Sequence, residues 1–345
     1  MKKPSRLLIL LGLVAAAALA AAGPFADAKK PRTTKVTVMT RNLFLGTDLI
    51  PIATAAPGAP AEKATGDAFR QATRTNQPGK RMKLIAREIA KSKPDLVGLQ
   101  EVSLWRTGPK GDSAPATNVA VDYLKVITKR LKALHAPYRV VTVRRQFNVE
   151  GPSDEGVDIR LTLGNAVLAR KGVKTSKVRS ADFKTTTPIP TASIGTVTIK
   201  RGFDEMNVVV RGARFHFVNT HLEAYSPPVR LRQAKELLKK ALPRRKGRAI
   251  LVGDLNSGPN LENEDDEPPY KAIAKAGFKP RRTARKSCCF DNDLRSGKWD
   301  HNIDWIMSRP RVRLLRSFLV GREKTSGGAR ASDHGGVVSV LRLTR

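Results

Sequence analysis

The sequence predicts a mixed α/β domain in which helices pack outside a sheet. Short apolar runs with the length of buried strands alternate with amphipathic helical segments between residues 35 and 134. Strand-like runs joined by turns then dominate residues 138–220. No internal repeat and no break in composition divides the chain, so residues 35–345 are expected to form a single domain.

The amino terminus has the pattern of a secretory signal peptide. Basic residues at positions 2, 3 and 6 precede an apolar run over residues 7–22, and Ala26-Asp27-Ala28 is a small-x-small cleavage pattern. A transmembrane anchor is the alternative, but the run is short and no stop-transfer pattern follows it. We therefore expect residues 1–28 to be cleaved, residues 29–34 to be a disordered leader, and the protein to be secreted.

The first half of the domain is predicted to contain two strands and two helices. Residues 35–40 alternate polar and apolar side chains as a half-buried strand does, whereas residues 51–77 are rich in Ala, Pro, Thr and Gly and predict a long surface loop. After Pro78-Gly79, apolar residues recur at helical spacing and end before Pro94. Residues 95–99 then form a buried strand, and residues 119–134 carry the apolar stripe of an amphipathic helix.

The second half is predicted to consist mostly of strands. Apolar or alternating runs indicate strands at residues 138–143, 165–169, 208–210, 215–220, 249–253, 302–307, 312–320 and 337–341. Helical patterns cover residues 228–241 and 270–276, and residues 150–158 read as a polar loop. The acidic tract at 262–267 is most simply a solvated loop, with a calcium site as the alternative because five carboxylates lie in six residues.

The chain is strongly basic. Its formal net charge is +34, and loss of residues 1–28, which hold three basic residues and one acidic residue, leaves +32. Excess Lys and Arg attract polyanions and release their counterions on binding, although a soluble exoenzyme with a basic surface is the alternative. The basic residues are spread along the chain, with clusters at residues 239–248 and 281–286.

The two cysteines of the chain, Cys288 and Cys289, are adjacent. This pattern excludes the disulfide framework of small secreted domains, so a large core must hold the fold. Adjacent cysteines can close a strained ring or remain buried thiols, and no zinc-site spacing surrounds them. We expect a structural role for them, away from any catalytic cleft.

Polar side chains end six of the predicted strands. They are Asn42, Glu101, His221, Asp254 with Asn256, Asp304, and Asp333 with His334. Asp254 and Asn256 stand two apart on a predicted extended segment, so their side chains are expected to face one cleft. Carboxylates with amides suit a hard divalent cation, and histidines beside carboxylates suit acid–base chemistry and phosphate binding. Each residue alone has a structural alternative, such as a turn or a buried core histidine, but the full set favours a site.

These residues lie in motifs that resemble the endonuclease/exonuclease/phosphatase superfamily, whose members include deoxyribonuclease I-like enzymes. The motifs are Met39-Thr-Arg-Asn42, Gly98-Leu-Gln-Glu101, Asn219-Thr-His-Leu-Glu223, Gly253-Asp-Leu-Asn256, Ile303-Asp304-Trp305 and Ser332-Asp-His334, in this order, within residues 35–343. The resemblance implies a four-layer α/β/β/α sandwich. It places the six motifs in one cleft at the edges of two central sheets.

The resemblance also implies a role for each site residue. Glu101, Asn42 and Asp333 would hold Mg²⁺, with Mn²⁺ or Ca²⁺ as alternatives. Asp254, with Asn256 beside it, would orient or deprotonate the attacking water. His221 and His334 would bind the phosphoryl oxygens at one phosphate site, with His334 oriented by Asp304. These roles agree with phosphoryl transfer, which needs positioning and neutralisation of charge.

The sequence departs from relatives at some positions. Phe44 stands two residues after the first-strand asparagine, where some relatives carry a carboxylate. The partner of His221 is not assigned by any motif, and Asp158 and Asn165 are candidates for this role and for substrate binding. His301 is either a loop residue, which we favour, or a further substrate contact.

The leading functional hypothesis is a secreted, metal-dependent phosphodiesterase that acts on nucleic acid. A sphingomyelinase-like or phospholipase C-like enzyme acting at anionic membranes is the first alternative, but it requires exposed aromatic or apolar residues, for which Phe44-Leu45 is the one candidate. A phosphomonoesterase is a further alternative. A non-catalytic binder of polyanions has no use for Glu101 and Asp254 in a basic cleft. No protein partner is implied.

Overall fold

The computed structural model describes residues 33–192, 194–242, 247–259, 261 and 263–344. The predicted signal peptide and residues 29–32 of the predicted leader lie outside this range. The chain forms one compact unit from Thr33 onward. Its first strand begins at Thr33, so the last two residues assigned to the leader belong to the fold.

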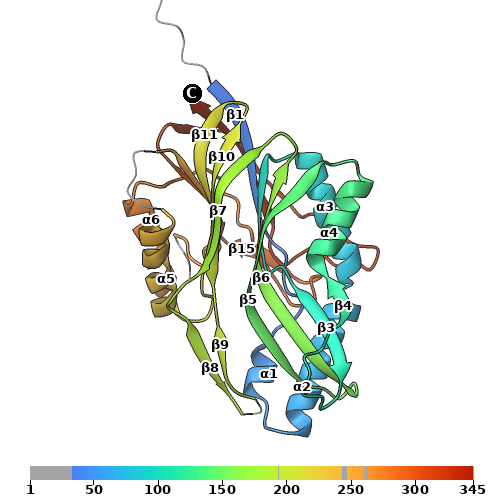
Figure 1. The fold of residues 1–345 in the computed structure, drawn as a ribbon. Coiled ribbons are helices and arrows are strands. Elements are labelled where there is room, and N and C mark those ends of the chain that lie inside the picture. The colour runs from blue at the N-terminus through green and yellow to red at the C-terminus, as the bar shows by residue number, and fades with distance from the viewer. Residues whose placement is uncertain (1–32, 193, 243–246, 260, 262, 345) are drawn as a thin grey trace, which may run out of the picture. The chain divides into compact units, whose positions relative to one another are not determined.

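Two sheets form the centre of the molecule (Figure 1). In the eight-stranded sheet the order is β17 (Val312–Val320), β18 (Gly336–Thr344), β1 (Thr33–Asn42), β2 (Leu96–Gln100), β6 (Val157–Arg170), β3 (Leu104–Pro109) and β4 (Asn118–Asp122), with β5 (Tyr138–Pro152) also paired to β6. In the six-stranded sheet it is β13 (Lys279–Pro280), β16 (Asp304–Arg309), β12 (Ala249–Asp254), β11 (Ala213–His221), β10 (Gly202–Val210) and β7 (Lys174–Asp182). Two hairpins stand apart, β8 (Thr187–Thr191) with β9 (Gly195–Ile199), and β14 (Cys288–Phe290) with β15 (Gly297–His301).

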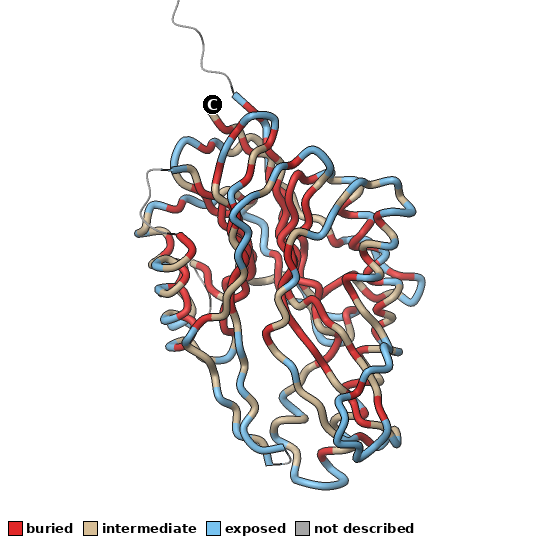
Figure 2. The backbone as a smooth tube through the Cα atoms, viewed as in Figure 1, coloured by how far each residue is buried: buried red, intermediate tan, exposed pale blue. Residues whose placement is uncertain are grey.

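Helices cover the outer face of each sheet, which confirms the four-layer α/β/β/α sandwich. The eight-stranded sheet packs against α3 (Pro78–Ser92) and α4 (Tyr123–Ala133), and the six-stranded sheet packs against α5 (Pro227–Lys240) and α6 (Pro268–Lys275). A third apolar cluster lies between the sheets and includes Val38, Leu96, Val167, Phe217 and Val252. Figure 2 shows buried backbone concentrated in the two sheets. The described residues include no helix long and apolar enough to cross a membrane.

The prediction of a surface loop at residues 51–77 is wrong. This stretch contains α1 (Ile50–Thr54), α2 (Ala59–Arg70) and the π-helix η1 (Gln71–Thr75). Proline stands in the first turn of both α1 and α2, where its missing N–H is harmless and its fixed φ favours a helix. Phe69 and Ala72 are buried in the core beside the eight-stranded sheet. The Pro-rich composition therefore marks helix starts and not a loop.

Two other boundaries also differ from prediction. The helix expected at 119–134 begins at Tyr123, because Asp122 caps it by accepting a hydrogen bond from the backbone N–H of Lys125 at 3.0 Å, and the preceding residues form β4. The polar loop expected at 150–158 is shorter, since β5 extends to Pro152 and β6 begins at Val157. In the acidic tract, η2 (Glu264–Asp266) forms a short 3-10 turn and Asp266 pairs with Arg230.

A buried polar network joins the two sheets behind their strand ends. The side chain of Gln100 donates to Asn219 Oδ1 at 2.7 Å, and Asn219 Nδ2 donates to Asp204 at 3.3 Å. Thr40 donates to Gln100 at 3.2 Å, and Ser180 donates to Asp204 at 2.6 Å. Burial raises the pKa of Asp204. Because Gln100, Asn219 and Asp204 are fully buried, their hydrogen bonds fix the relative position of the sheets.

Candidate active site

Strand pairing brings the predicted site residues together. In the parallel pair β11–β12, His221 stands opposite Asp254, and in the antiparallel pair β12–β16, Asp254 stands opposite Asp304. In the parallel pair β1–β2, Asn42 stands opposite Gln100, the residue before Glu101. The carboxyl ends of parallel strands lie at the same edge of a sheet, so each sheet presents its polar residues at one edge.

Asn42 connects the two sheets at this edge. Its Nδ2 donates to Glu101 Oε1 at 2.9 Å and to Asp254 Oδ2 at 3.0 Å. Its Oδ1 accepts from the backbone N–H of Phe44 at 2.9 Å, and Glu101 Oε2 accepts from the N–H of Leu45 at 2.7 Å. Asn42 and Glu101 are thus held in fixed orientations, and both lie beside Asp254.

Asp254 and Asn256 do lie together, but the predicted reason is wrong. The strand ends at Asp254, and Asn256 is in the left-handed region with φ 46°. Asp254 Oδ1 accepts from the backbone N–H of Asn256 at 2.9 Å, which closes an Asx turn. A turn, and not the alternation of an extended strand, therefore sets their spacing.

His221 is buried between two hydrogen-bond donors, Arg201 and Asn256. Nη1 of Arg201 lies 3.1 Å from its Nδ1, and Nδ2 of Asn256, which also donates to the carbonyl of Leu222, lies 3.1 Å from its Nε2. Asp254 Oδ2 is 3.6 Å from Nε2, beyond a normal hydrogen bond. Burial and the charges of Arg201 and His334 hold the pKa of His221 well below its usual value. The ring is therefore neutral.

His334 has the opposite electrostatic setting. Its Nδ1 lies 3.0 Å from Asp304 Oδ2, which also accepts from Ser287 Oγ at 2.7 Å. Burial lowers the pKa of His334, but the carboxylates of Asp304, Asp333 and Asp254 outweigh it, so the pKa is raised well above the usual value. Nε2 of this imidazolium is 3.8 Å from Asp254 Oδ2, the oxygen that also faces His221. As expected, the two histidines share one site.

Four carboxylates lie close together at this edge, and their chemistry suits a divalent cation. They belong to Glu101, Asp254, Asp304 and Asp333. The pKa of Asp254 is raised to about 7 by burial, with a contribution from Asp304. The pKa of Asp333 is raised to about 6 by burial, with a contribution from Glu101. Oxygen donors that repel one another in a buried site fit a hard cation such as Mg²⁺, and the predicted set of Asn42, Glu101 and Asp333 offers such donors. Asp254, Asp304 and His334 also bring ligand atoms within 4.8 Å of one another.

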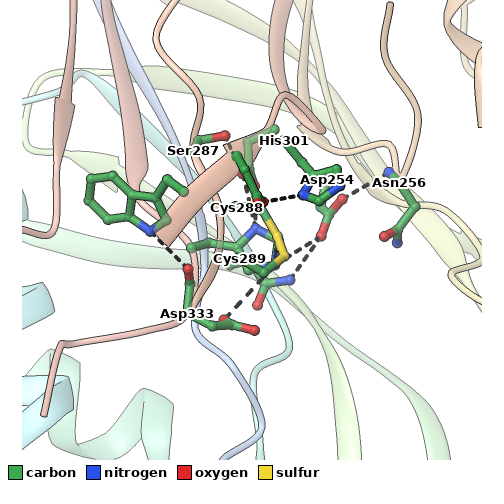
Figure 3. The surroundings of a disulfide bond; sticks show 12 residues. Asp254, Asn256, Ser287, Cys288, Cys289, His301 and Asp333 are labelled. Carbon is green, nitrogen blue, oxygen red and sulfur yellow. Dashed lines mark hydrogen bonds and ion pairs between the residues drawn. A yellow bond between two sulfur atoms is a disulfide. The ribbon is translucent and has the colours of Figure 1, made fainter. Parts of the chain in front are cut away.

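The expectation that the cysteines lie away from the site is wrong. Cys288 and Cys289 form a disulfide (Figure 3). Their sulfurs lie 3.4 Å and 3.9 Å from Nε2 of His334. The β14–β15 hairpin carries them there, since Phe290 N–H donates to the carbonyl of Asp333 at 3.0 Å. The hairpin lies between the motifs in sequence, so motif spacing did not reveal this contact.

The structure does not bring Asp158 into the site. Asp158 stands at the start of β6, where its carboxylate accepts from the N–H of Gly111 at 3.0 Å.

Asn165, seven residues further along β6, does lie at the site. It lines a small pocket with Glu101 and His221, and its Nδ2 donates to the carbonyl of Gly202 at 3.4 Å. His301 pairs with Asp300 on β15. Sequence reasoning missed Arg201, which no motif contains.

Comparisons with known proteins give the family and the fold of the chain. A family model described as Endonuclease/Exonuclease/phosphatase family matches residues 68–334. TDP2 of D. rerio, solved in complex with a single-strand DNA product, superposes with a TM-score of 0.52 and 18% identity over 89% of this chain and 99% of that chain. No match was found among curated proteins.

Two solved structures from Bacteroides thetaiotaomicron are also similar. An endonuclease/exonuclease/phosphatase family protein has a TM-score of 0.54 and 20% identity over 90% of this chain and 99% of that chain. A mannosyl-6-phosphatase has a TM-score of 0.51 and 20% identity over 89% of this chain and 99% of that chain. At these identities the likeness concerns the fold.

Proposed function

The chain belongs to the endonuclease/exonuclease/phosphatase family and is a metal-dependent phosphoric ester hydrolase, and from this premise we propose that it is a secreted, Mg²⁺-dependent nuclease. Secretion rests on the amino-terminal sequence pattern. The choice of nucleic acid over other phosphate esters rests on the mature charge of +32 and on one feature of the surface beside the site.

That feature is a groove between β5 and the β8–β9 hairpin, whose lining has three cations against two carboxylates, with Arg144 paired to Asp182, and which we call the basic groove. The groove, of about 660 Å³, is lined by Arg144, Arg145, Gln146, Phe147, Asn148, Val149, Glu150, Asp182, Ile194, Thr196, Val197, Thr198 and Lys200. Gln146, Phe147 and Lys200 also line the small pocket that contains Glu101 and His221, so the groove continues into the site. A polyanion lying in it would reach the candidate phosphate site.

Further arginines stand beside the groove. Burial lowers the pKa of Arg106, and the charges of Arg160 and Arg145 lower it further, so these three cations lie close to one another. Crowding of cations on one surface costs free energy that an anionic ligand recovers. Phe147 lines the groove and is half-buried against the core, and single-stranded bases stack on aromatic side chains. The surface therefore suits a single-stranded nucleic acid.

The site residues can perform hydrolysis of a phosphodiester. Asp254, with a pKa near 7 and an orientation fixed by Asn42 and by the N–H of Asn256, can accept a proton from the attacking water. His334, charged and oriented by Asp304, can donate through Nε2 to a phosphoryl oxygen. A cation held by Glu101, Asn42 and Asp333 would neutralise charge on the phosphate.

His221 acts as a neutral donor in this scheme. Arg201 can only donate, so Nδ1 of His221 accepts and the ring proton sits on Nε2. The amide nitrogen of Asn256 is a donor as well, and the carboxylate of Asp254 is too distant for a normal hydrogen bond. The N–H at Nε2 of His221 therefore has no acceptor among these groups, and a phosphoryl oxygen would supply one.

The one candidate membrane contact of a sphingomyelinase-like or phospholipase C-like enzyme, Phe44-Leu45, is not available at the surface. Phe44 is only 6% exposed and packs with Leu294 and Ala329, and Leu45 packs against the core beside the eight-stranded sheet. The large exposed apolar residues, such as Ile50, Val119 and Tyr225, come from separate parts of the chain. A phosphomonoesterase shares the site chemistry but has no use for an extended basic groove.

The proposal is tested by incubating the protein with DNA, RNA, sphingomyelin vesicles, inositol phosphates and bis(p-nitrophenyl) phosphate, each with Mg²⁺ and with chelator. We expect Mg²⁺-dependent cleavage of nucleic acid that weakens steeply with salt, with a slope of about −0.7 to −0.9 per phosphate contact. Cleavage of the small diester should barely respond to salt. Cleavage of vesicles or inositol phosphates without cleavage of nucleic acid at low salt would contradict the proposal.

A further inference from the structure

We propose that Cys288, Cys289 and His334 form a second metal site, which binds a thiophilic divalent cation such as Zn²⁺ once a dithiol has reduced the disulfide. The three ligand atoms, two Sγ and one Nε2, lie within 4.8 Å of one another. Two thiolates and an imidazole are ligands that Zn²⁺ prefers and Mg²⁺ does not. The site is thus chemically distinct from the cluster of oxygen donors beside it.

The histidine is already arranged as a metal ligand. Its Nδ1 faces Asp304, which leaves Nε2 directed toward the sulfurs. A carboxylate on the remote nitrogen is the usual partner of a zinc-bound histidine, because it fixes the ring and raises the basicity of the ligand nitrogen. Ser287 donates to the same Asp304 at 2.7 Å, which ties the residue before the cysteines to this carboxylate.

Backbone hydrogen bonds hold both sides of the cysteine pair. Before it, Ser287 N–H donates to the carbonyl of His301 at 2.8 Å, and the carbonyl of Ser287 accepts from Gly335 N–H at 2.6 Å. After it, Phe290 N–H donates to the carbonyl of Asp333. None of these bonds requires the disulfide, so we expect the sulfurs to stay beside His334 after reduction.

Reduction proceeds by thiol–disulfide exchange. Cys288 is buried, whereas Cys289 is exposed, so a dithiol can attack at Cys289. The S–S bond breaks, the two cysteines gain two electrons and two protons, and the dithiol is oxidised to its own disulfide. Binding of the cation then releases three protons to solvent, the two thiol protons and the Nε2 proton of the His334 imidazolium. The oxidised protein lacks both thiolate ligands and cannot form the site.

Occupancy of this site would oppose hydrolysis, a consequence that rests on the proposed function. Nε2 of His334 is the atom assigned to the phosphoryl oxygen. This nitrogen cannot bind a cation through its lone pair and donate a proton to the substrate at the same time. The site would therefore couple activity to two conditions, the redox state of the surroundings and the supply of a thiophilic cation.

The test uses Co²⁺ as the probe, because thiolate-to-Co²⁺ charge transfer absorbs in the near ultraviolet and oxygen ligands give no such band. Protein treated with dithiothreitol and desalted without oxygen is titrated with Co²⁺ in excess Mg²⁺. We expect a band that saturates at one equivalent in the reduced protein and no band in the oxidised protein. Zn²⁺ should displace the Co²⁺ and abolish the band.

Two variants sharpen the result. The band should be absent in the double variant Cys288→Ser, Cys289→Ser, and Co²⁺ should bind at least 10-fold more weakly to reduced His334→Gln. Two free thiols without a band, a band unchanged in His334→Gln, or reduced protein that has lost its near-ultraviolet circular dichroism would each overturn the proposal. The readout needs no catalysis, so it is independent of whether the protein is a nuclease. Inhibition by Zn²⁺ only after reduction tests the coupling separately.

Discussion

Nη1 of Arg201 lies 3.1 Å from Nδ1 of His221, so a cation and not a carboxylate orients this histidine. A guanidinium has no acceptor, and its charge also opposes protonation of the ring. The site therefore pairs a neutral histidine with the charged His334, and both face Oδ2 of Asp254.

Replacement of Arg201 should impair catalysis without unfolding the protein. In Arg201→Gln the proton of His221 is free to move to Nδ1, so we expect kcat/KM for bis(p-nitrophenyl) phosphate to fall roughly 10-fold or more. Arg201→Lys keeps a cationic donor and should recover part of the loss. The matched control is Arg214→Gln, which removes the same charge from an exposed position at the other end of β11 and should keep full activity. Equal rates for Arg201→Gln and Arg214→Gln would show that Arg201 has no such role.

The carboxylates of Glu101 and Asp254 should be needed for turnover and not for folding. In Glu101→Gln and in Asp254→Asn we expect kcat to fall roughly 10²-fold or more, because one change removes a charged cation ligand and the other removes the proton acceptor. Chelator should abolish activity of the unaltered protein, and Mg²⁺ should restore it. Circular dichroism checks the fold, and full activity of either variant would refute the assignment.

Cations of the basic groove should determine the salt dependence of nucleic acid binding. In Arg145→Gln and in Lys200→Gln we expect weaker binding of a single-stranded oligonucleotide and a salt slope smaller by about 0.7 per lost contact. Binding is measured by fluorescence anisotropy between 50 and 200 mM salt. Arg313→Gln, an exposed change on β17 of the same charge, serves as the control. An unchanged slope in both groove variants would place the nucleic acid elsewhere.

The network between the sheets should contribute strongly to stability. In Asn219→Ala, Gln100 and Asp204 lose a buried partner, so we expect the free energy of unfolding to fall by roughly 2–4 kcal/mol. Urea denaturation measures the change. Asn118→Ala, at an exposed position on β4, should cost little. A similar midpoint for both variants would show that the network is not important for stability.

The strand ends could be predicted from the sequence because their signals are local. An apolar run that stops at a carboxylate, an amide or a histidine is visible at Asn42, His221 and Asp254, and the fold places such ends together. The order of the motifs then indicated which ends belong to one site.

Other features depend on contacts between distant segments and could not be predicted. Arg201 enters the site through the register of β10 with β11, which pairs the next residue, Gly202, with His221. The cysteines reach His334 because Gly335 N–H donates to Ser287, a tertiary hydrogen bond with no sequence signature. At Asn256 the sequence predicts the right contact for the wrong reason. The left-handed conformation of Asn256 brings its side chain close to Asp254, as an extended strand would also have done.

The pairing of β1 with β18 has a consequence for biosynthesis. Thr40 stands opposite Val337, so the first and last strands of the domain are neighbours, and the backbone carbonyl of Asn42 accepts a hydrogen bond from Ser332 at 2.9 Å. Contacts of such long sequence separation form late and slowly. A nascent chain that still lacks its carboxyl-terminal segment has no His334 and no complete phosphate site. A nuclease of the proposed kind would therefore be unable to cleave the nucleic acids of the cell that makes it until synthesis of the chain has finished.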